Sequence, residues 1–341
     1  MSLQVKPSEA TEMVATYIRS QVVPMIHGSP GIGKSQIVQQ IANQYNLKLI
    51  DLRLSQCDPT DLAGFPQIDI ARQKAGYLPM DTFPLEGEQP PAGYSGWLLF
   101  FDEANSAPKA VQAAAYKIIL DRKIGQTSLH KNCALVAAGN LETDGAIVEE
   151  MSTALQSRMA HIELTVDSKE WVQWAQDHDI NHRITDYIQF KPGNLYTFKP
   201  DHTDRTYACP RTWEFANRVV NTAGQDSPLL MKLLTGVVGE GVAREFASFC
   251  KLYEKLPKPA QLLGNPQGIE IPTEPSILYA LTGTISHNAT ADNLSSLMKF
   301  VRRLPAEFQV VTLRDTVRRN KSLMAHPDIR EWIATSAAEL F

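Results

Sequence analysis

Residues 22–45 read VVPMIHGSPGIGKSQIVQQIANQY, and this stretch decides the fold of the N-terminal part of the chain. The apolar run at 22–26 predicts a short buried strand. A glycine-rich turn follows, and a helix is predicted from Lys34 to about Tyr45. Apolar residues at 47–54 predict a second strand. Strand, helix and strand in this order form a βαβ unit, which predicts a parallel sheet with helices on its faces.

The turn matches the pattern G-x-x-x-x-G-K-[ST] of phosphate-binding loops, and its residues are Gly28, Ser29, Pro30, Gly31, Ile32, Gly33, Lys34 and Ser35. Glycines let successive backbone N–H groups point at phosphate oxygens, and the helix that starts at Lys34 adds the positive end of its dipole. Lys34 would reach the β- and γ-phosphates, and the Ser35 hydroxyl would bind Mg²⁺. We therefore predict that residues 28–36, from Gly28 to Gln36, bind a nucleotide.

A second apolar run, at 97–101, predicts a buried strand that ends in Asp102 and Glu103. Ligands bind at the carboxyl ends of the strands in an open parallel sheet. Asp102 is predicted to hold Mg²⁺ and Glu103 to polarise the attacking water. The alternative is a strand that ends in a solvated acidic turn.

Two further positions complete the predicted catalytic set. Asn140 follows a predicted strand at 134–138 and would orient the water, although a plain strand-end turn residue is the alternative. Arg158 ends a short helix predicted near 149–157. An arginine placed there would stabilise charge on the phosphate transferred in a neighbouring subunit. The alternative for Arg158 is an ordinary surface charge.

The rest of the chain divides into an α/β part and a helical part. Apolar periodicity predicts a helix at 8–20, one at 108–121, and a last strand near 161–164. Glycine and proline punctuate residues 64–96, which predicts hairpins and loops inserted into the core fold. After residue 167 helices dominate, and they are predicted at about 168–175, 182–190, 211–223, 228–238, 240–254, 275–284, 292–304 and 327–339.

The order GSPGIGKS, LLFFDEANSAPKAVQAA, VAAGN, ALQSRM and CPRTWEFANR resembles the AAA+ ATPases, and within them the MoxR-like branch. The resemblance covers about 5–225, and DEANSAPKAVQAA is its most specific part. It implies that 64–96 is similar to the helix-2 insertion of that branch. It also makes CPR similar to the SPR of the lid, with Arg211 as the sensor-2 arginine. Cys209 replaces the usual Ser and Met159 the usual Phe or Cys, and neither change removes a catalytic group.

The resemblance implies an AAA+ P-loop NTPase core at 1–165 and a helical lid at 166–260. Residues 261–341 lie outside the resemblance, and their apolar periodicity predicts a C-terminal helical extension. The resemblance also implies an oligomeric motor that binds ATP and Mg²⁺, hydrolyses ATP in a hexameric ring, and remodels a partner protein. A von Willebrand factor A domain protein is the partner expected from family habit. A nucleotide-gated scaffold with little turnover and a DNA-directed AAA+ protein are the alternatives.

Composition weighs against nucleic acid as the partner. The chain has 341 residues and a net charge of −4, which is not typical of a nucleic-acid-binding protein. The support for DNA is a basic tract that consists of Lys299, Arg302, Arg303, Arg314, Arg318, Arg319 and Lys321. The four cysteines form no CxxC pair, and no apolar run is long enough to span a membrane. We therefore expect a soluble cytoplasmic protein with reduced thiols.

Overall fold

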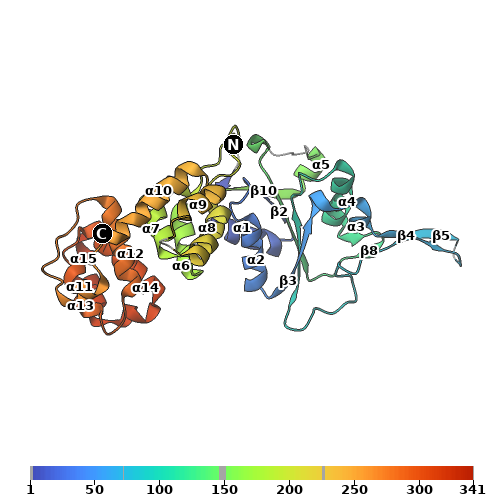
Figure 1. Ribbon diagram of the computed structural model, residues 1–341. Helices are drawn as coiled ribbons and strands as arrows, with labels where there is room; N and C mark the ends of the chain where they lie inside the picture. The colour runs from blue at the N-terminus through green and yellow to red at the C-terminus, as the bar shows by residue number, and fades with distance from the viewer. Residues whose placement is uncertain (1–2, 72, 146–150, 225–226, 341) are drawn as a thin grey trace. The chain divides into compact units, whose positions relative to one another are not determined.

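The computed structural model describes residues 3–71, 73–145, 151–224 and 227–340 (Figure 1). The chain forms two compact units. The first consists of Met1–Asp167 with Lys199–His202, and the second of Ser168–Phe198 with Thr203–Phe341.

A six-stranded sheet forms the centre of the first unit. Its strands are all parallel and lie in the order β1–β10–β2–β9–β6–β3. Because the strands are parallel, their carboxyl ends share one edge of the sheet. The predicted parallel α/β fold is therefore confirmed. The strands are β1 (Gln4–Val5), β2 (Val23–His27), β3 (Leu47–Arg53), β6 (Gly96–Asp102), β9 (Cys133–Gly139) and β10 (Met159–Leu164).

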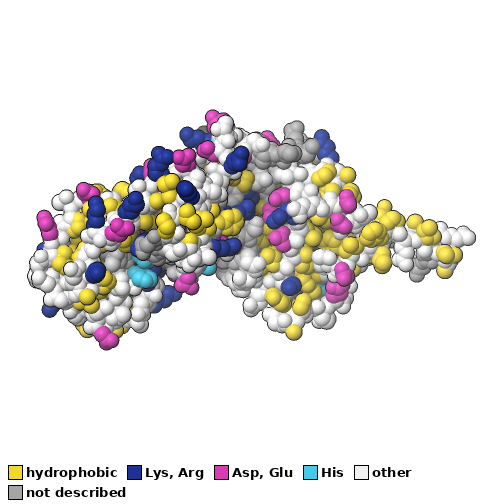
Figure 2. All heavy atoms as spheres, in the orientation of Figure 1, with side chains coloured by type: hydrophobic (Ala, Val, Ile, Leu, Met, Phe, Trp, Pro, Cys, Tyr) yellow, Lys and Arg dark blue, Asp and Glu magenta, His cyan; other side chains and the backbone are white. Residues whose placement is uncertain are grey.

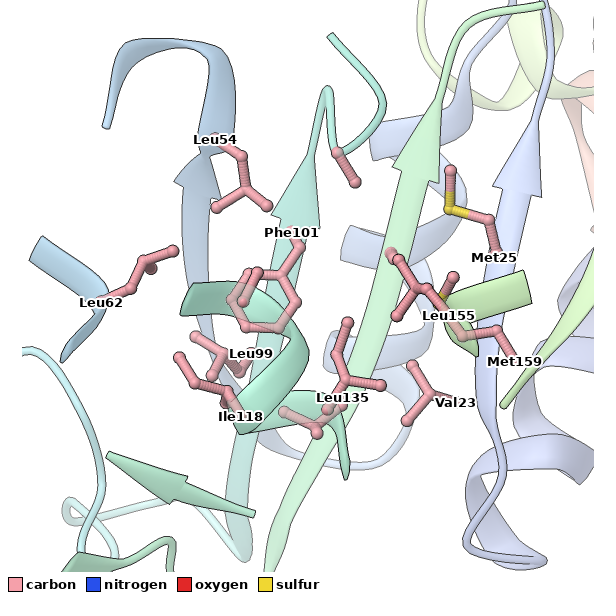
Figure 3. Close-up of a cluster of buried hydrophobic side chains, with 14 of the residues drawn as sticks. Val23, Met25, Leu54, Leu62, Leu99, Phe101, Ile118, Leu135, Leu155 and Met159 are labelled. Atoms are coloured by element: carbon pink, nitrogen blue, oxygen red, sulfur yellow. The ribbon is translucent and has the colours of Figure 1, made fainter. Parts of the chain in front are cut away.

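Both faces of this sheet are covered by helices, which explains why its central strands are apolar throughout. On one face, α1 (Pro7–Arg19) and α2 (Lys34–Gln44) contact the strands. On the other, α4 (Lys109–Asp121) packs its apolar stripe on alternate strand residues such as Leu99 and Phe101 (Figure 3). All seven residues of β6 are buried. The strand that leads to the acidic pair is thus held rigidly from both sides.

The glycine- and proline-rich segment forms a hairpin and loops, as predicted. Its strands β4 (Phe65–Asp69) and β5 (Lys74–Leu78) pair antiparallel and project from the first unit (Figure 1). The hairpin carries large apolar side chains that are exposed to solvent (Figure 2). They are Phe65, Ile68, Ile70, Tyr77 and Leu78. Two small elements were not predicted. One is the short helix α3 (Pro59–Ala63). The other is a hairpin with two residues in each strand, β7 (Lys123–Ile124) and β8 (Thr127–Ser128).

The helix predicted near 149–157 is present as α5 (Thr153–Gln156), and Ser152 caps it by accepting a hydrogen bond from the Leu155 N–H. Residues 149 and 150 of that prediction lie outside the described part of the chain. The β-strand β10 follows α5 directly, so Arg158 lies in the turn between them.

The second unit is helical, as predicted. Large aromatic side chains, among them Tyr187, Trp213 and Phe246, pack together where its first helices meet. Within the described ranges, no helix is long and apolar enough to cross a membrane. The helices are α6 (Ser168–Asp177), α7 (His182–Phe190), α8 (Pro210–Ala223), α9 (Leu230–Val238), α10 (Glu240–Cys250), α11 (Pro259–Gly264), α12 (Pro275–Asn288), α13 (Leu294–Val301), α14 (Ala306–Arg319) and α15 (Pro327–Leu340).

The helix α14 was not predicted from the sequence. It contains β-branched residues such as Val310, Val311 and Thr312, which lower helix propensity. Its packing against α12 decides the outcome, because Phe308 and Leu313 are buried in the core of the C-terminal helices. The α7 and α12 helices also contact each other, so the predicted lid and the C-terminal helices lie in one unit. A subdivision of this unit at residue 260 stays a prediction.

Candidate active site

The predicted phosphate-binding loop connects β2 to α2. Gly31 and Gly33 have φ angles of 78° and 104°, a region that residues with a Cβ seldom adopt. Gly33 is the N-cap of α2, whose first residue is Lys34. The loop therefore ends at the positive pole of a helix, where backbone N–H groups favour an anion.

Lys34 lies deep in this loop and is 8% exposed. Its Nζ donates hydrogen bonds to the backbone oxygens of Gly28 at 2.5 Å and Ser29 at 3.0 Å. It also donates to Oδ1 of Asn140 at 3.1 Å. A buried ammonium needs such partners. The side chain is thus positioned among oxygen acceptors that phosphate oxygens could replace.

The acidic pair stands at the carboxyl end of β6. Asp102 is 8% exposed, and its Oδ2 accepts a hydrogen bond from the Ser35 hydroxyl at 3.2 Å. Its Oδ1 accepts from the backbone N–H of Glu103 at 2.9 Å. Carboxylate and hydroxyl oxygens are ligands that Mg²⁺ prefers. The two predicted metal ligands are therefore brought together and have the right chemistry for that ion.

Glu103 has a φ of 54°, so the chain turns sharply after Asp102. One oxygen of its carboxylate accepts a hydrogen bond from Ser55, and the other lies 3.6 Å from Nε of Arg53. Arg53 is the last residue of β3, the neighbouring strand, and Ser55 lies in the 3-10 turn Leu54–Gln56 that follows it. Sequence reasoning assigned no role to Ser55 or Arg53. The available signal was their position at the end of a predicted strand.

Asn140 follows β9, the strand between β2 and β6. Its backbone is held by the side chain of Asn105, which is 3% exposed. The sequence placed Asn105 within the most specific run, DEANSAPKAVQAA, but gave no reason for an amide there. Asn140 and Lys34 are in direct hydrogen-bond contact, so the predicted water-orienting group and the predicted phosphate-binding lysine share one site.

A histidine pair beside the loop also escaped prediction. Nε2 of His27 lies 2.9 Å from Nδ1 of His161, and Nε2 of His161 lies 2.8 Å from the carbonyl oxygen of Gln156. The carbonyl accepts only, so neutral His161 carries its proton on Nε2 and His27 donates to Nδ1. Burial, followed by the charge of His161, lowers the pKa of His27 to about 4. His27 therefore stays neutral at physiological pH, and the pair links the base of the loop to the turn that carries Arg158.

The two remaining predicted site residues are Arg158 and Arg211. Arg158 is exposed, in the turn between α5 and β10 of the first unit. Arg211 is exposed at the second position of α8, after Pro210, in the second unit. Their predicted roles in catalysis stay predictions.

A comparison with known protein families finds a match in the first unit. Residues 24–159 match the family profile of an AAA domain of the dynein-related subfamily. No curated protein sequence matches the chain at a significant level.

Two solved structures of Thermotoga maritima RuvB are similar to it. A point mutant of RuvB has 16% identity and a TM-score of 0.39, with 85% of this chain and 83% of that chain covered. The RuvB Holliday junction branch migration motor has 15% identity and a TM-score of 0.38, with 85% and 84% covered. These likenesses are weak, so the assignment depends on the profile match and on the parallel sheet with its phosphate-binding loop. Residues 24–159 are therefore similar to an AAA domain, and the first unit has an AAA+ nucleotide-binding fold.

Proposed function

We propose that this protein binds ATP with Mg²⁺ and hydrolyses the ATP. The observation that carries the proposal is the meeting of Lys34, Ser35, Asp102, Glu103 and Asn140 at the carboxyl ends of three adjacent strands. These residues come from segments far apart in the sequence, and each has the chemistry that phosphoryl transfer requires.

Binding would begin with an exchange of partners at Lys34. Its Nζ leaves the carbonyl oxygens of Gly28 and Ser29 and donates to β- and γ-phosphate oxygens, while loop N–H groups surround the phosphates. Ser35 and Asp102 would hold the metal ion. Mg²⁺ supplies charge neutralisation on the β- and γ-phosphate oxygens.

Glu103 would act on the attacking water. The water oxygen bonds to the γ-phosphorus, the bond from that phosphorus to the bridging oxygen breaks, and ADP and phosphate form. Glu103 accepts the proton that the water loses, and Asn140 orients the water. Ser55 and Arg53 fix the direction of the Glu103 carboxylate, which general-base catalysis requires.

Two arginines would complete the site. Arg158 is exposed, and we propose that it reaches the γ-phosphate in the neighbouring subunit of a hexameric ring. Arg211 would contact the γ-phosphate from the helical lid, the role that the resemblance to MoxR-like AAA+ proteins implies. Hydrolysis would then depend on assembly, because each pocket lacks an arginine until a neighbour supplies it.

We propose that hydrolysis in this cytoplasmic ring remodels a protein partner, as in the MoxR-like branch, with a von Willebrand factor A domain protein as the candidate. The apolar side chains exposed on the β4–β5 hairpin support a protein partner, because exposed apolar patches often mark interaction sites (Figure 2).

The basic tract does not favour DNA as the partner, since four of its arginines make contacts within their own unit. Arg302 pairs with Glu331 and Arg314 with Asp315. The other two donate hydrogen bonds: Arg303 to the carbonyls of Pro266 and Ile269, and Arg318 to the side chain of Gln176.

The test compares wild type with Glu103→Gln, and with Glu88→Gln as a control for an exposed carboxylate outside the site. Glu103→Gln should bind a fluorescent ATP analogue normally and lose turnover by about 10²–10⁴-fold, the usual contribution of a general base. Glu88→Gln should match wild type. Turnover by Glu103→Gln at the wild-type rate would contradict the assignment of the base.

The shared site is tested by mixing variants. Lys34→Ala disables the phosphate-binding loop, and Arg158→Ala removes the arginine proposed to act in the neighbouring subunit. Each variant alone should therefore be inactive. A mixture should regain hydrolysis, because the Lys34→Ala subunit can supply Arg158 to the intact loop of the Arg158→Ala subunit. A rate per subunit that is independent of protein concentration and of mixing would exclude the role of Arg158 in a neighbour. Wild type that binds ATP without hydrolysing it at any concentration would favour the nucleotide-gated scaffold.

A further inference from the structure

The side chain of Asn105 makes two hydrogen bonds with the backbone of Asn140, the residue that follows strand β9. Its Nδ2 donates to the carbonyl oxygen of Asn140 at 2.8 Å, and its Oδ1 accepts from the N–H of Asn140 at 3.0 Å. A primary amide offers a donor and an acceptor side by side, which is what both groups of one residue require. Asn105 is 3% exposed, so water cannot easily take over either bond.

The packing around this contact is tight and involves Gly139. A Cβ built on Gly139 would lie 2.2 Å from Oδ1 and 2.6 Å from Cγ of Asn105. The amide can therefore reach the backbone of Asn140 only because the preceding residue has no side chain. A third hydrogen bond, from the N–H of Ala104 to the carbonyl of Ala138 at 2.8 Å, ties the same two segments together.

These bonds join the turn that carries Glu103 to the end of the strand that carries Asn140. Asn105 lies two residues after Glu103, and the same turn is closed by a hydrogen bond from Ser106 N–H to the Glu103 carbonyl at 2.9 Å. The side chain of Asn140 is in turn bonded to Lys34. The distance between the proposed base and the proposed water-orienting amide thus depends on Asn105.

We propose that Asn105 is a positioning residue for ATP hydrolysis, which sets the place of Asn140 relative to Glu103. This inference rests on the proposed function. Asn105 has no direct contact with the nucleotide in this scheme, because it acts through the backbone of Asn140. A displacement of about 1 Å in a catalytic group can reduce a rate by roughly 10²-fold.

Asn105→Asp is the sharpest perturbation, because it preserves shape and the acceptor for the Asn140 N–H. It replaces the donor with an oxygen that faces the Asn140 carbonyl, so one bond becomes a repulsion. Asn132→Asp is the matched control. Asn132 lies at the opposite, amino end of β9, and its Nδ2 makes a long 3.4 Å contact with the Ser95 carbonyl.

The first measurement is single-turnover ATP hydrolysis, with affinity for a fluorescent ATP analogue measured on the same samples. Asn105→Asp should lower the hydrolysis rate about 10–100-fold while the dissociation constant changes by less than about threefold, and Asn132→Asp should match wild type. A hydrolysis rate in folded Asn105→Asp within about twofold of wild type would overturn the inference. So would an equal loss of affinity and rate, which indicates a merely structural role.

The second measurement needs no turnover and separates this inference from the proposed hydrolase activity. In the Glu103→Gln background, the ratio of the ADP to the ATP dissociation constant reports contact with the γ-phosphate. Because Asn105 places Asn140 near that phosphate, adding Asn105→Asp should reduce the ratio about two- to threefold, as expected when one hydrogen bond is weakened and not lost. If the wild-type protein does not hydrolyse ATP, only the proposed activity is refuted. If Asn105→Asp leaves the ratio of the ADP to the ATP dissociation constant unchanged, the role of Asn105 is refuted.

Discussion

Replacement of Gly139 by alanine tests the contact between the two strand ends directly. Gly139 is the last residue of β9, and its φ lies outside the left-handed region, so alanine fits the backbone without strain. Two opposing effects remain. Alanine reduces the freedom of the unfolded chain, and its methyl group must share space with Asn105 and with Cε of Met25, which would be 2.7 Å away.

The magnitudes decide which effect dominates. Restricting the unfolded chain stabilises a protein by about 0.4–1 kcal/mol when the native backbone suits alanine. Overpacking a buried site costs about 1–3 kcal/mol. The amide of Asn105 belongs to a buried side chain held by two hydrogen bonds, so it cannot move aside without loss. We expect Gly139→Ala to destabilise the first unit by roughly 1–2 kcal/mol.

Hydrogen exchange in a peptide that covers β9 is the suitable assay, because the chain has two units and a whole-chain unfolding curve would mix them. Protection of β9 should fall roughly 5–30-fold. Gly76→Ala is the matched control: Gly76 lies in β5 of the same unit, and a Cβ there would meet no atom within 4 Å.

Gly76→Ala should leave protection of β9 unchanged. Gly139→Ala should in addition hydrolyse ATP more slowly, since it displaces Asn105 from Asn140. Wild-type protection in β9 together with wild-type hydrolysis in Gly139→Ala would refute the tight fit described here.

Two further substitutions test packing and a buried acid. Phe101→Ala, in the fully buried strand before the acidic pair, should destabilise the first unit by about 3–5 kcal/mol, measured by the same exchange method. Asp186 is buried in the helical unit, and burial raises its pKa from 3.8 to about 8 against the hydrogen bond from Tyr253. The native state therefore keeps the Asp186 carboxyl protonated up to about pH 8, whereas the unfolded chain loses this proton above about pH 4. The stability that the protonated carboxyl contributes is fully present below about pH 4 and is lost as the pH rises toward 8. Asp186→Asn should therefore gain stability relative to wild type between pH 5 and pH 8, measured by hydrogen exchange in a peptide that covers α7 after correction for the intrinsic exchange rate at each pH. A difference that is constant over this range would exclude the titration of Asp186.

Elements that depend on local interactions could be predicted from the amino-acid sequence. The strand at 22–26, the loop with Gly31 and Gly33, and the helix from Lys34 follow from apolar runs, glycine conformations and helix periodicity within a few residues. The acidic pair after a buried strand was identified in the same way. Chemistry that a motif concentrates in one segment can be recognised without the fold, because neighbouring residues in sequence are neighbours in space.

Contacts between segments that are distant in sequence could not be predicted and are visible only in the tertiary structure. The strand order β1–β10–β2–β9–β6–β3 differs from the chain order, and it alone brings Asn105 to Asn140, Ser55 to Glu103 and His27 to His161. The helix α14 forms against its local propensity because burial of Phe308 and Leu313 outweighs it. Such pairings depend on which distant surfaces pack together, and no periodicity within one segment carries that information.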